Sequence, residues 1–276
     1  MNILICPVCK NDLIEEAKLY QCKLNHVFDL SRQGYLNLLL SQMKNSIDPG
    51  DNKEMVKSRS RFLNQGHYSA ISEILNQQIK EKLMQSSMLN GQIADIGCGN
   101  GYYLKNLKNY LSTLQCWGID ISKEAIQLAA KEIKNIKWIV SSIAELPFHE
   151  QSLQGIISVF SPLNFTEFNR ILDKDGYLFV VYPAAEHLYQ LREILFSDVK
   201  KIENDRILKH SSEYFCVEGE IPLQYSIHLA SNEEITNLFS MTPYYWRCTP
   251  EKKQHVLSLT HLELTIDIRL WIFKSK

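Results

Sequence analysis

The stretch Asp95-Ile96-Gly97-Cys98-Gly99-Asn100-Gly101 decides the fold of this chain. Apolar residues (Ile93, Ala94 and Ile96) lead into it and helix-forming residues follow from Tyr102, so the pattern predicts a strand, a glycine loop and a helix. Glycine lacks a Cβ and tolerates positive φ, which lets the backbone of such a loop approach a ligand closely. The spacing is G-x-G-x-G rather than the G-x-G-x-x-G of pyrophosphate-binding dehydrogenases, and this favours S-adenosylmethionine, a ligand without a diphosphate. A tight strand–helix turn without a ligand is the alternative.

Beyond this loop, short apolar runs alternate with amphipathic segments. The expected strands are 92–96, 115–120, 137–141, 154–160 and 176–182, and the expected helices are 102–110, 123–132 and 167–172. Such alternation predicts an α/β fold, with a parallel sheet and helices on both of its faces. After residue 183 we expect a helix over 186–196, an irregular middle, a strand over 224–229, a helix near 232–239 and a last strand over 262–273.

The length of 276 residues suits one large domain and a small one. The pattern divides the chain into a cysteine-rich domain over 1–36, a helical connector over 37–90 with a turn at Asp48-Pro49-Gly50-Asp51, and the α/β domain over 91–276. The net charge of −1 gives no overall attraction to nucleic acid, so such affinity requires a local basic patch. Neither a signal-like segment nor an uncharged stretch of about 18 residues occurs, so we expect a cytoplasmic protein without membrane contact.

Four residues near the N-terminus have the spacing of a metal site. Cys6 and Cys9 form a C-x-x-C pair, Cys22 follows after twelve residues, and His26 follows after three more. A tight turn and a short hairpin can bring such a set to the corners of a tetrahedron, and thiolate with imidazole suits zinc. We therefore predict a structural Zn²⁺ bound by all four side chains, which also stabilises a domain too small to fold alone. A redox role of the C-x-x-C pair is the weaker alternative, because no βαβ pattern surrounds it.

Three further loops follow predicted strands and supply the rest of a cofactor site. Asp120 ends the second strand, where an acid can accept hydrogen bonds from both ribose hydroxyls of an adenosine; capping of the next helix is the alternative. Ile121 and Ile143 are the expected apolar contacts of the adenine, although either also fits a plain core position. Ser142 and Phe160 lie in the loops after the third and fourth strands. In open α/β sheets ligands bind at the carboxyl ends of strands, so these loops define one crevice.

In their order and spacing, these loops resemble the motifs of class I S-adenosylmethionine-dependent methyltransferases. The glycine loop looks like their first motif and 118–122 like their ribose-binding acid, while 144–148 and 170–178 look like the later motifs. The resemblance covers about residues 92–183 and implies a Rossmann-like sheet that binds this cofactor. Two departures, Gln154 in place of a common Asp and Gly176 in place of a glycine pair, lie at strand starts and have little effect on cofactor binding.

The whole chain resembles the bacterial 23S rRNA (guanine-N1)-methyltransferases, in which a small zinc domain precedes the methyltransferase domain. The matching stretches are 6–9, 22–29, 34–39, 48–51, 61–68, 95–103 and 241–247. The resemblance implies methyl transfer to N1 of one guanine in a hairpin of 23S rRNA, a homodimer, and cofactor contacts at Tyr68, Tyr103 and His187. With the loops above, the predicted cofactor contacts are Tyr68, Asp95, Gly97, Gly99, Gly101, Tyr103, Leu104, Asp120, Ile121, Ser142, Ile143, Phe160 and His187.

Binding to RNA requires cations that the overall charge does not supply. Between residues 31 and 61 the chain has six Lys and Arg residues, Lys44 among them, against three acids. Lys53, Lys57 and Arg61 recur every four residues and share one helix face. A basic face beside a zinc domain fits contact with phosphates, and an ordinary solvated helix surface is the alternative.

Two other functions would use the same motifs. One is a small-molecule methyltransferase, against which the zinc domain and the basic helix face speak. The other is an RNA-binding factor with an inactive cofactor domain, against which the intact glycine loop and Asp120 speak. His187 and Asp95 are candidates for accepting the N1 proton of guanine, but neither position requires that role, so the sequence assigns no catalytic base.

Overall fold

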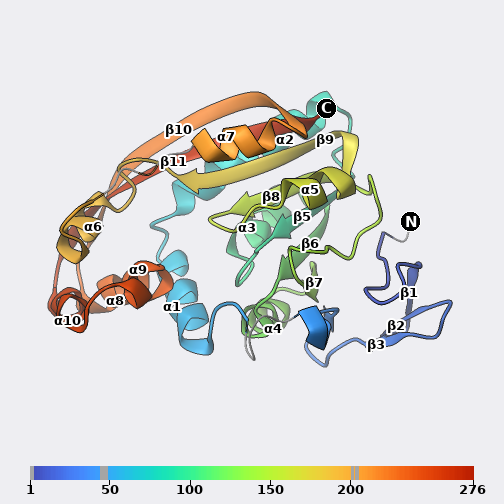
Figure 1. Ribbon diagram of the computed structural model, residues 1–276, viewed down its shortest axis with the longest axis horizontal. Helices are drawn as coiled ribbons and strands as arrows, with labels where there is room; N and C mark the ends of the chain where they lie inside the picture. The colour runs from blue at the N-terminus through green and yellow to red at the C-terminus, as the bar shows by residue number, and fades with distance from the viewer. Residues whose placement is uncertain (1–2, 44–48, 200–201, 203–204) are drawn as a thin grey trace.

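The computed structural model of the chain describes residues 3–43, 49–199, 202 and 205–276 (Figure 1). Among these residues the centre is an eight-stranded sheet in the order β10-β11-β9-β8-β5-β6-β7-β4. Its strands are β4 Tyr35–Asn37, β5 Gln92–Ile96, β6 Gln115–Asp120, β7 Lys137–Val140, β8 Leu153–Val159, β9 Leu172–Pro183, β10 Phe215–Leu229 and β11 Leu262–Ser275. Neighbouring strands from β4 to β9 are parallel, whereas β11 is antiparallel to β9 and β10 is antiparallel to β11.

Helices connect the strands and extend beyond them. They are α1 Lys53–Asn64, α2 Ser69–Gln85, α3 Tyr102–Tyr110, α4 Lys123–Glu132, α5 Phe165–Ile171, α6 Tyr189–Leu195, α7 Asp205–Ser211, α8 Asn232–Met241, α9 Tyr244–Arg247 and α10 Pro250–Ser258, with a 3₁₀ turn at Ser41–Met43. Within the described ranges, none of these helices combines the length and apolar character needed to cross a lipid bilayer.

Alternate residues of the sheet face two separate hydrophobic cores. Ile93 and Ile157 belong to one core, which α2, α3 and α4 cover. Ala94 and Ile156 belong to the other core, which α5 and α7 cover. This is the arrangement expected when side chains of successive strand residues point to opposite faces. The predicted α/β fold, a Rossmann-like sheet with helices on both faces, is confirmed.

The N-terminal domain is a small antiparallel sheet of β1 Leu13–Glu16, β2 Leu19–Cys22 and β3 Val27–Asp29. It lies at one end of the molecule in Figure 1 and packs against the core that α5 and α7 cover. The amide of Ile5 donates to Pro147 O at 3.0 Å, and the amide of His149 donates to Ile3 O at 2.9 Å. The small domain is therefore fixed to the large one rather than tethered by a linker.

One strand of the main sheet was not predicted. The short strand β4 lies parallel to β7 and contacts the N-terminal domain through a bridge between Leu30 and Leu36. The expected division at residue 36 falls inside β4, and it stays a prediction. A strand of three residues carries too few side chains to reveal a period, so sequence patterning reads it as connector.

The second difference is at the other edge of the sheet, where the sequence indicates an irregular stretch before residue 224. The structure has α7 and the first nine residues of β10 there. β10 contains Gly219 and Pro222, which normally speak against a strand. Pro222 is tolerated because β10 is the edge strand and pairs with β11 on one side only. The strands expected to be parallel, β5 to β9, are parallel, and β11 and β10 add an antiparallel edge to them.

Candidate cofactor and zinc sites

A cavity of about 380 Å³ lies at the carboxyl ends of the parallel strands, where the sequence places the cofactor. Of the predicted cofactor contacts, its walls contain Tyr68, Asp95, Gly97, Gly99, Tyr103, Asp120, Ile121, Ile143 and Phe160. The cavity volume falls within the ~300–1,000 Å³ range of small-molecule sites. Gly101, Leu104, Ser142 and His187 are buried and are not among the residues that line the cavity.

The glycine loop is required for packing as well as for access to a ligand. Gly97 has a φ of +80°, and a Cβ placed on it would lie 2.4 Å from Cβ of Ser161. Gly101 has a φ of +78° and begins α3, and a Cβ there would lie 2.3 Å from the ring of Trp138. Both positions therefore combine a left-handed backbone with a close contact that only glycine allows. The loop is therefore a tight strand–helix turn that also forms part of the cavity wall.

Asp120 is the acid that organises the loop. Its Oδ2 accepts a hydrogen bond from the Gly99 amide and its Oδ1 from the Ser122 amide, both at 2.8 Å. Burial raises the pKa of this carboxyl, and the two amide donors act in the opposite direction. The cap of α4 is Ser122 itself, whose Oγ accepts from the Ala125 amide at 3.2 Å. Asp120 thus remains available to the cavity, because each carboxylate oxygen can accept more than one hydrogen bond.

Asp95 is almost completely buried in the same wall, with 1% of its surface exposed. Neither of its carboxylate oxygens has a hydrogen-bond partner within the described part of the chain, and the same holds for Oη of Tyr103. Burial, with a smaller effect of the nearby Asp120 charge, raises the pKa of Asp95 to about 8. Such orphaned buried acceptors normally have a ligand or water as partner. A buried carboxylate fits the cationic ammonium of the methionine moiety of S-adenosylmethionine, and Asp120 fits its ribose.

The raised pKa of Asp95 predicts a pH-dependent stability of the cofactor-free protein. An unfolded aspartate titrates near pH ~3.9, whereas the pKa of folded Asp95 is about 8. Between these values the folded state binds one more proton, so the free energy of unfolding falls as pH rises, by up to about 1.4 kcal/mol per pH unit. Asp95→Asn removes this dependence, so urea unfolding from pH 5 to 8 should show a variant increasingly more stable than wild type. If the free energies of unfolding of the two proteins changed with pH in parallel, Asp95 would not be protonated in the folded state.

His187 is not among the residues that line the cavity, but its ring contacts two that do, Tyr68 and Phe160. Its ring centroid is 5.4 Å from that of Phe160 and 6.5 Å from that of Tyr68. Burial lowers the pKa of His187 to about 4, so its imidazole is neutral at pH 7. Its Nδ1 accepts from the Asp267 amide at 3.3 Å. The histidine therefore supports the aromatic wall formed by Tyr68 and Phe160.

One part of the cavity lining was not predicted from the sequence, and it consists of Gly50, Asp51, Arg59 and Met241. Ser122 Oγ donates to Asp51 O at 2.7 Å, and the Arg59 guanidinium forms an ion pair with the Asp51 carboxylate. Arg59 Nη2 also approaches Met241 O at 3.5 Å. The stretches 48–51 and 241–247 carry part of the family resemblance, which was the available signal, although Asp48 lies outside the described residues.

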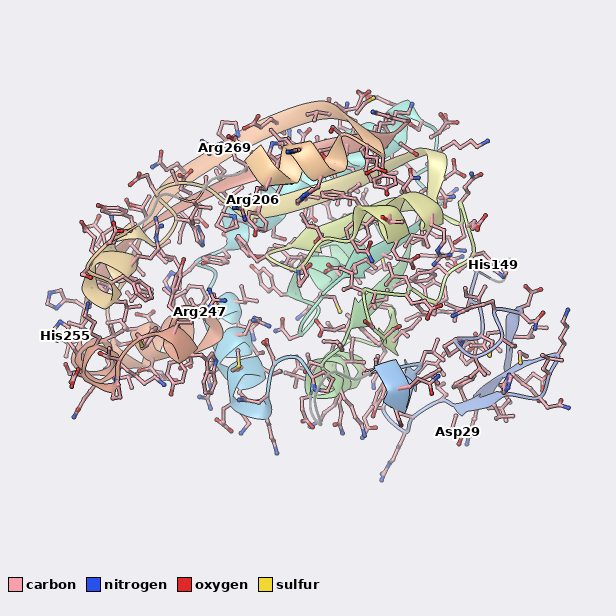
Figure 2. All side chains as sticks on the ribbon, viewed as in Figure 1. Asp29, His149, Arg206, Arg247, His255 and Arg269 are labelled. Atoms are coloured by element: carbon pink, nitrogen blue, oxygen red, sulfur yellow. The ribbon has the colours of Figure 1, made fainter. Side chains whose placement is uncertain are left out.

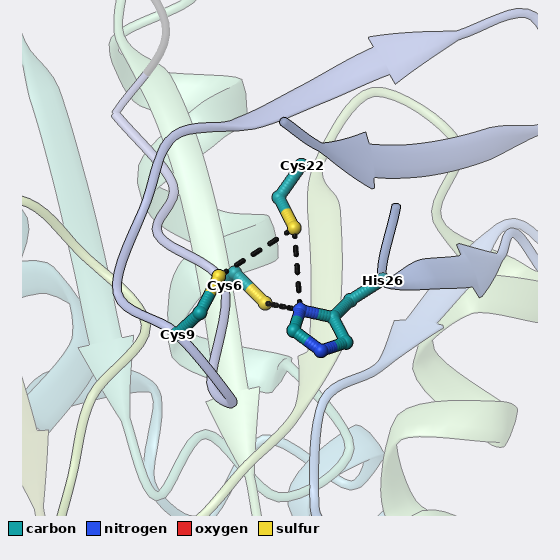
Figure 3. Close-up of side chains that lie close together, drawn as sticks. All are labelled: Cys6, Cys9, Cys22 and His26. Atoms are coloured by element: carbon teal, nitrogen blue, oxygen red, sulfur yellow. Dashed lines mark hydrogen bonds between the residues drawn. The ribbon is translucent and has the colours of Figure 1, made fainter. Parts of the chain in front are cut away.

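The four predicted zinc ligands come together in the N-terminal domain (Figure 3). Their ligand atoms lie within 4.8 Å of one another: Cys9 Sγ to Cys22 Sγ is 3.5 Å, Cys22 Sγ to His26 Nδ1 is 3.4 Å and Cys6 Sγ to His26 Nδ1 is 3.6 Å. Bonds of about 2.3 Å from zinc to sulfur place tetrahedral ligand atoms about 3.8 Å apart, so the set fits zinc.

The side-chain amide of Asn11 favours the thiolate form of one cysteine in this cluster. Asn11 Nδ2 donates to Cys9 Sγ at 3.2 Å, and this hydrogen bond is the main reason why the pKa of the Cys9 thiol falls to about 6. Cys6, by contrast, is buried and its pKa is raised by that burial. Thiolates are the form that binds zinc, and all positions of the tetrahedron come from protein, as in structural rather than catalytic zinc sites.

Comparisons with known proteins agree with this geometry. The family model described as "RlmA, N-terminal", a zinc ribbon, matches residues 4–47, and the model described as "Methyltransferase domain" matches residues 93–176. A Bacillus subtilis protein provisionally named a 23S rRNA (guanine-N(1)-)-methyltransferase is 29% identical over 97% of this chain and 95% of its own length. The 23S rRNA (guanine(748)-N(1))-methyltransferase of Streptomyces fradiae is 28% identical over 91% of this chain and 89% of its own length. A solved geranyl diphosphate methyltransferase in complex with SAM has a TM-score of 0.50 at 14% identity, covers 83% of this chain and 93% of its own, and shows the fold alone.

The fold and the two sites define a class I S-adenosylmethionine-dependent methyltransferase with a zinc ribbon ahead of its catalytic domain. The chain combines a zinc ribbon of the RlmA type with a methyltransferase domain, and over most of its length it is 28–29% identical to relatives named 23S rRNA (guanine-N1)-methyltransferases. The resemblance recognised in the sequence is thereby confirmed. The roles of individual cofactor residues remain predictions that variants can test.

Proposed function

We propose that this protein transfers a methyl group from S-adenosylmethionine to N1 of a guanine in a hairpin of 23S rRNA. The observation that carries the proposal is that a zinc ribbon is fixed to a methyltransferase domain in one chain, which aligns over most of its length with relatives named 23S rRNA (guanine-N1)-methyltransferases. A small-molecule methyltransferase needs the cofactor cavity but has no use for the ribbon.

The side chains around the cavity suit a flat acceptor. The bound cofactor supplies an electrophilic methyl group on a sulfonium, and the acceptor nitrogen must lose its proton as the new bond forms. Phe160, 37% exposed with a φ of +52°, lines the cavity, and such a left-handed backbone at a bulky residue is often associated with function. A guanine released from its stack would find this ring and that of Tyr68 as surfaces.

The basic face of α1 supports an RNA substrate. Lys53, Lys57 and Arg61 are all exposed, while Arg59 on the same helix lines the cofactor cavity. Lys57 has a partner, Glu54 at 3.0 Å, so its charge is partly compensated. Lys44, which belongs to the same predicted patch, lies outside the described residues. A cationic helix at the border of the cavity would contact phosphates of the hairpin whose base enters it.

Transfer of radioactive methyl from labelled S-adenosylmethionine tests the proposal directly. The purified protein is incubated with 23S rRNA hairpins and, in parallel, with a pool of small metabolites, and N1-methylguanine is located by arrest of reverse transcription. We expect label in the RNA at one guanine. Label in small molecules alone would indicate a metabolite methyltransferase, and tight hairpin binding without transfer would indicate an RNA-binding factor.

We further propose that the protein acts in the cytoplasm as a homodimer, as the family resemblance implies. Light scattering coupled to size-exclusion chromatography measures the mass of the particle in solution. A mass of about 64 kDa, twice the 32.0 kDa of one chain, is expected. A mass equal to one chain across a wide concentration range would rule out the dimer.

A further inference from the structure

A second cavity, of about 480 Å³, adjoins the cofactor cavity at the carboxyl ends of the parallel strands. The two cavities share Ser161 and Pro162, which lie in the loop after β8. The start of α5, the end of β9 and α7 complete the second cavity. When an acceptor base enters the cofactor cavity past this loop, the parts of the substrate next to that base lie over the second cavity.

The wall between the two cavities is held by hydrogen bonds. Ser161 Oγ donates to Ile96 O at 2.8 Å, and Asn164 Nδ2 donates to Ile143 O at 3.0 Å. Ile96 and Ile143 line the cofactor cavity, so the second cavity is fixed to the cofactor site. On the far side, Thr166 Oγ1 donates to Oη of Tyr214 at 3.1 Å and joins α5 to the turn after α7.

The chemistry of the second cavity is that of a site for a nucleotide. Arg206 projects from α7 (Figure 2), is exposed, and has neither a hydrogen-bond nor an ion-pair partner within the ranges that the structure describes. His210 lies one turn further along the same helix, and Glu213 contributes one negative charge to the lining. Tyr182 and Tyr214 add two aromatic rings. A guanidinium without a partner binds phosphate well, and tyrosine rings accept bases or riboses.

We propose that the second cavity holds the nucleotide next to the methylated guanine, with its phosphate on Arg206 and its sugar or base against Tyr182 and Tyr214. This inference rests on the proposed function and makes it more specific. Contacts in the second cavity would hold the RNA strand next to the target base, which must leave its stack to be methylated. Arg206 is then a positioning residue for RNA and has no part in cofactor binding.

The test compares Arg206→Gln with a control on the same helix. Lys209 is an exposed cation of α7 that does not line the cavity, so Lys209→Gln removes an equal charge at a matched place. For Arg206→Gln we expect the KM for the rRNA hairpin to rise about tenfold, because a hydrogen-bonded charge contact is lost. The affinity should also depend less steeply on salt: the magnitude of the slope of log affinity against log salt should decrease by about 0.7 to 0.9, the contribution of one phosphate. The Kd for S-adenosylmethionine should stay unchanged.

Conservative replacement sharpens the comparison. Arg206→Lys keeps the charge and should keep the wild-type salt slope, whereas Lys209→Gln should leave both KM and slope near wild type. The subsite is overturned if wild type methylates the hairpin while Arg206→Gln has the KM and slope of Lys209→Gln. If wild type neither binds nor methylates the hairpin, the proposed function fails, and the subsite fails with it.

Discussion

Replacing Asp120 with alanine is expected to weaken binding of S-adenosylmethionine at least about 100-fold. The carboxylate lines the cavity and its two oxygens already order the loop through the amides of Gly99 and Ser122. Hydrogen bonds from two ribose hydroxyls to a charged acceptor are each worth roughly 1.5–3 kcal/mol, and their joint loss gives this factor. Isothermal titration calorimetry measures the Kd.

A second aspartate provides the control for this variant. Asp175 is exposed at the start of β9 and pairs with Lys274 at 3.6 Å, so Asp175→Ala also removes a carboxylate, but away from the cavity. It should bind the cofactor as wild type does. Thermal unfolding of both variants without cofactor checks that each is folded. An Asp120→Ala protein that is folded and binds within threefold of wild type would refute the assignment of Asp120 to the ribose.

Loss of the metal is the other change with a large expected effect. Cys22→Ser removes one of four ligands from a domain whose own core is small, and bound zinc contributes directly to the folding of such domains. Cys6, Leu13 and Cys22 pack into the same core as Phe148 of the large domain, so loss of zinc also destabilises the large domain. We expect the variant to lose zinc and its thermal midpoint to fall by about 10 °C or more.

Zinc content is measured by elemental analysis and compared with that of Cys216→Ser. Cys216 is an exposed thiol on β10 and takes no part in the cluster. About one zinc ion per chain is expected for wild type and for this control, as a single four-ligand site requires. If Cys22→Ser kept its zinc and its thermal midpoint, the four-ligand site would be wrong.

Local spacing was enough to predict the parts of the site that lie in single loops. The glycine loop, Asp120 and the cysteine cluster each depend on a few consecutive residues whose chemistry is specific, and the structure places them in the cavity or the cluster as expected. Ile121 and Ile143 also line the cavity, so their apolar character is not only that of core residues. These positions follow from the rule that strand ends meet at one edge of a sheet.

What the pattern could not predict depends on packing between distant segments. In the sequence Arg59 is only one of the six cations between residues 31 and 61, yet in the structure it approaches Met241 O, 182 residues later, and lines the cavity. The strand β4 joins the sheet through pairing with β7, which no period within three residues can reveal. His187, expected as a cofactor contact by resemblance, is not among the residues that line the cavity but contacts Phe160, which is, and its role in cofactor binding stays a prediction. In each case the contact partner lies far away in the sequence.

Whether this protein makes N1-methylguanine in 23S rRNA is decided by a map of that nucleoside in cells. The gene is deleted, and N1-methylguanine in 23S rRNA is located by reverse-transcription arrest and mass spectrometry. We expect that one modified guanine disappears, that the wild-type gene restores it, and that the gene with Asp120→Ala does not. Persistence of every N1-methylguanine in the deletion strain, with no second enzyme of this kind present, would contradict it.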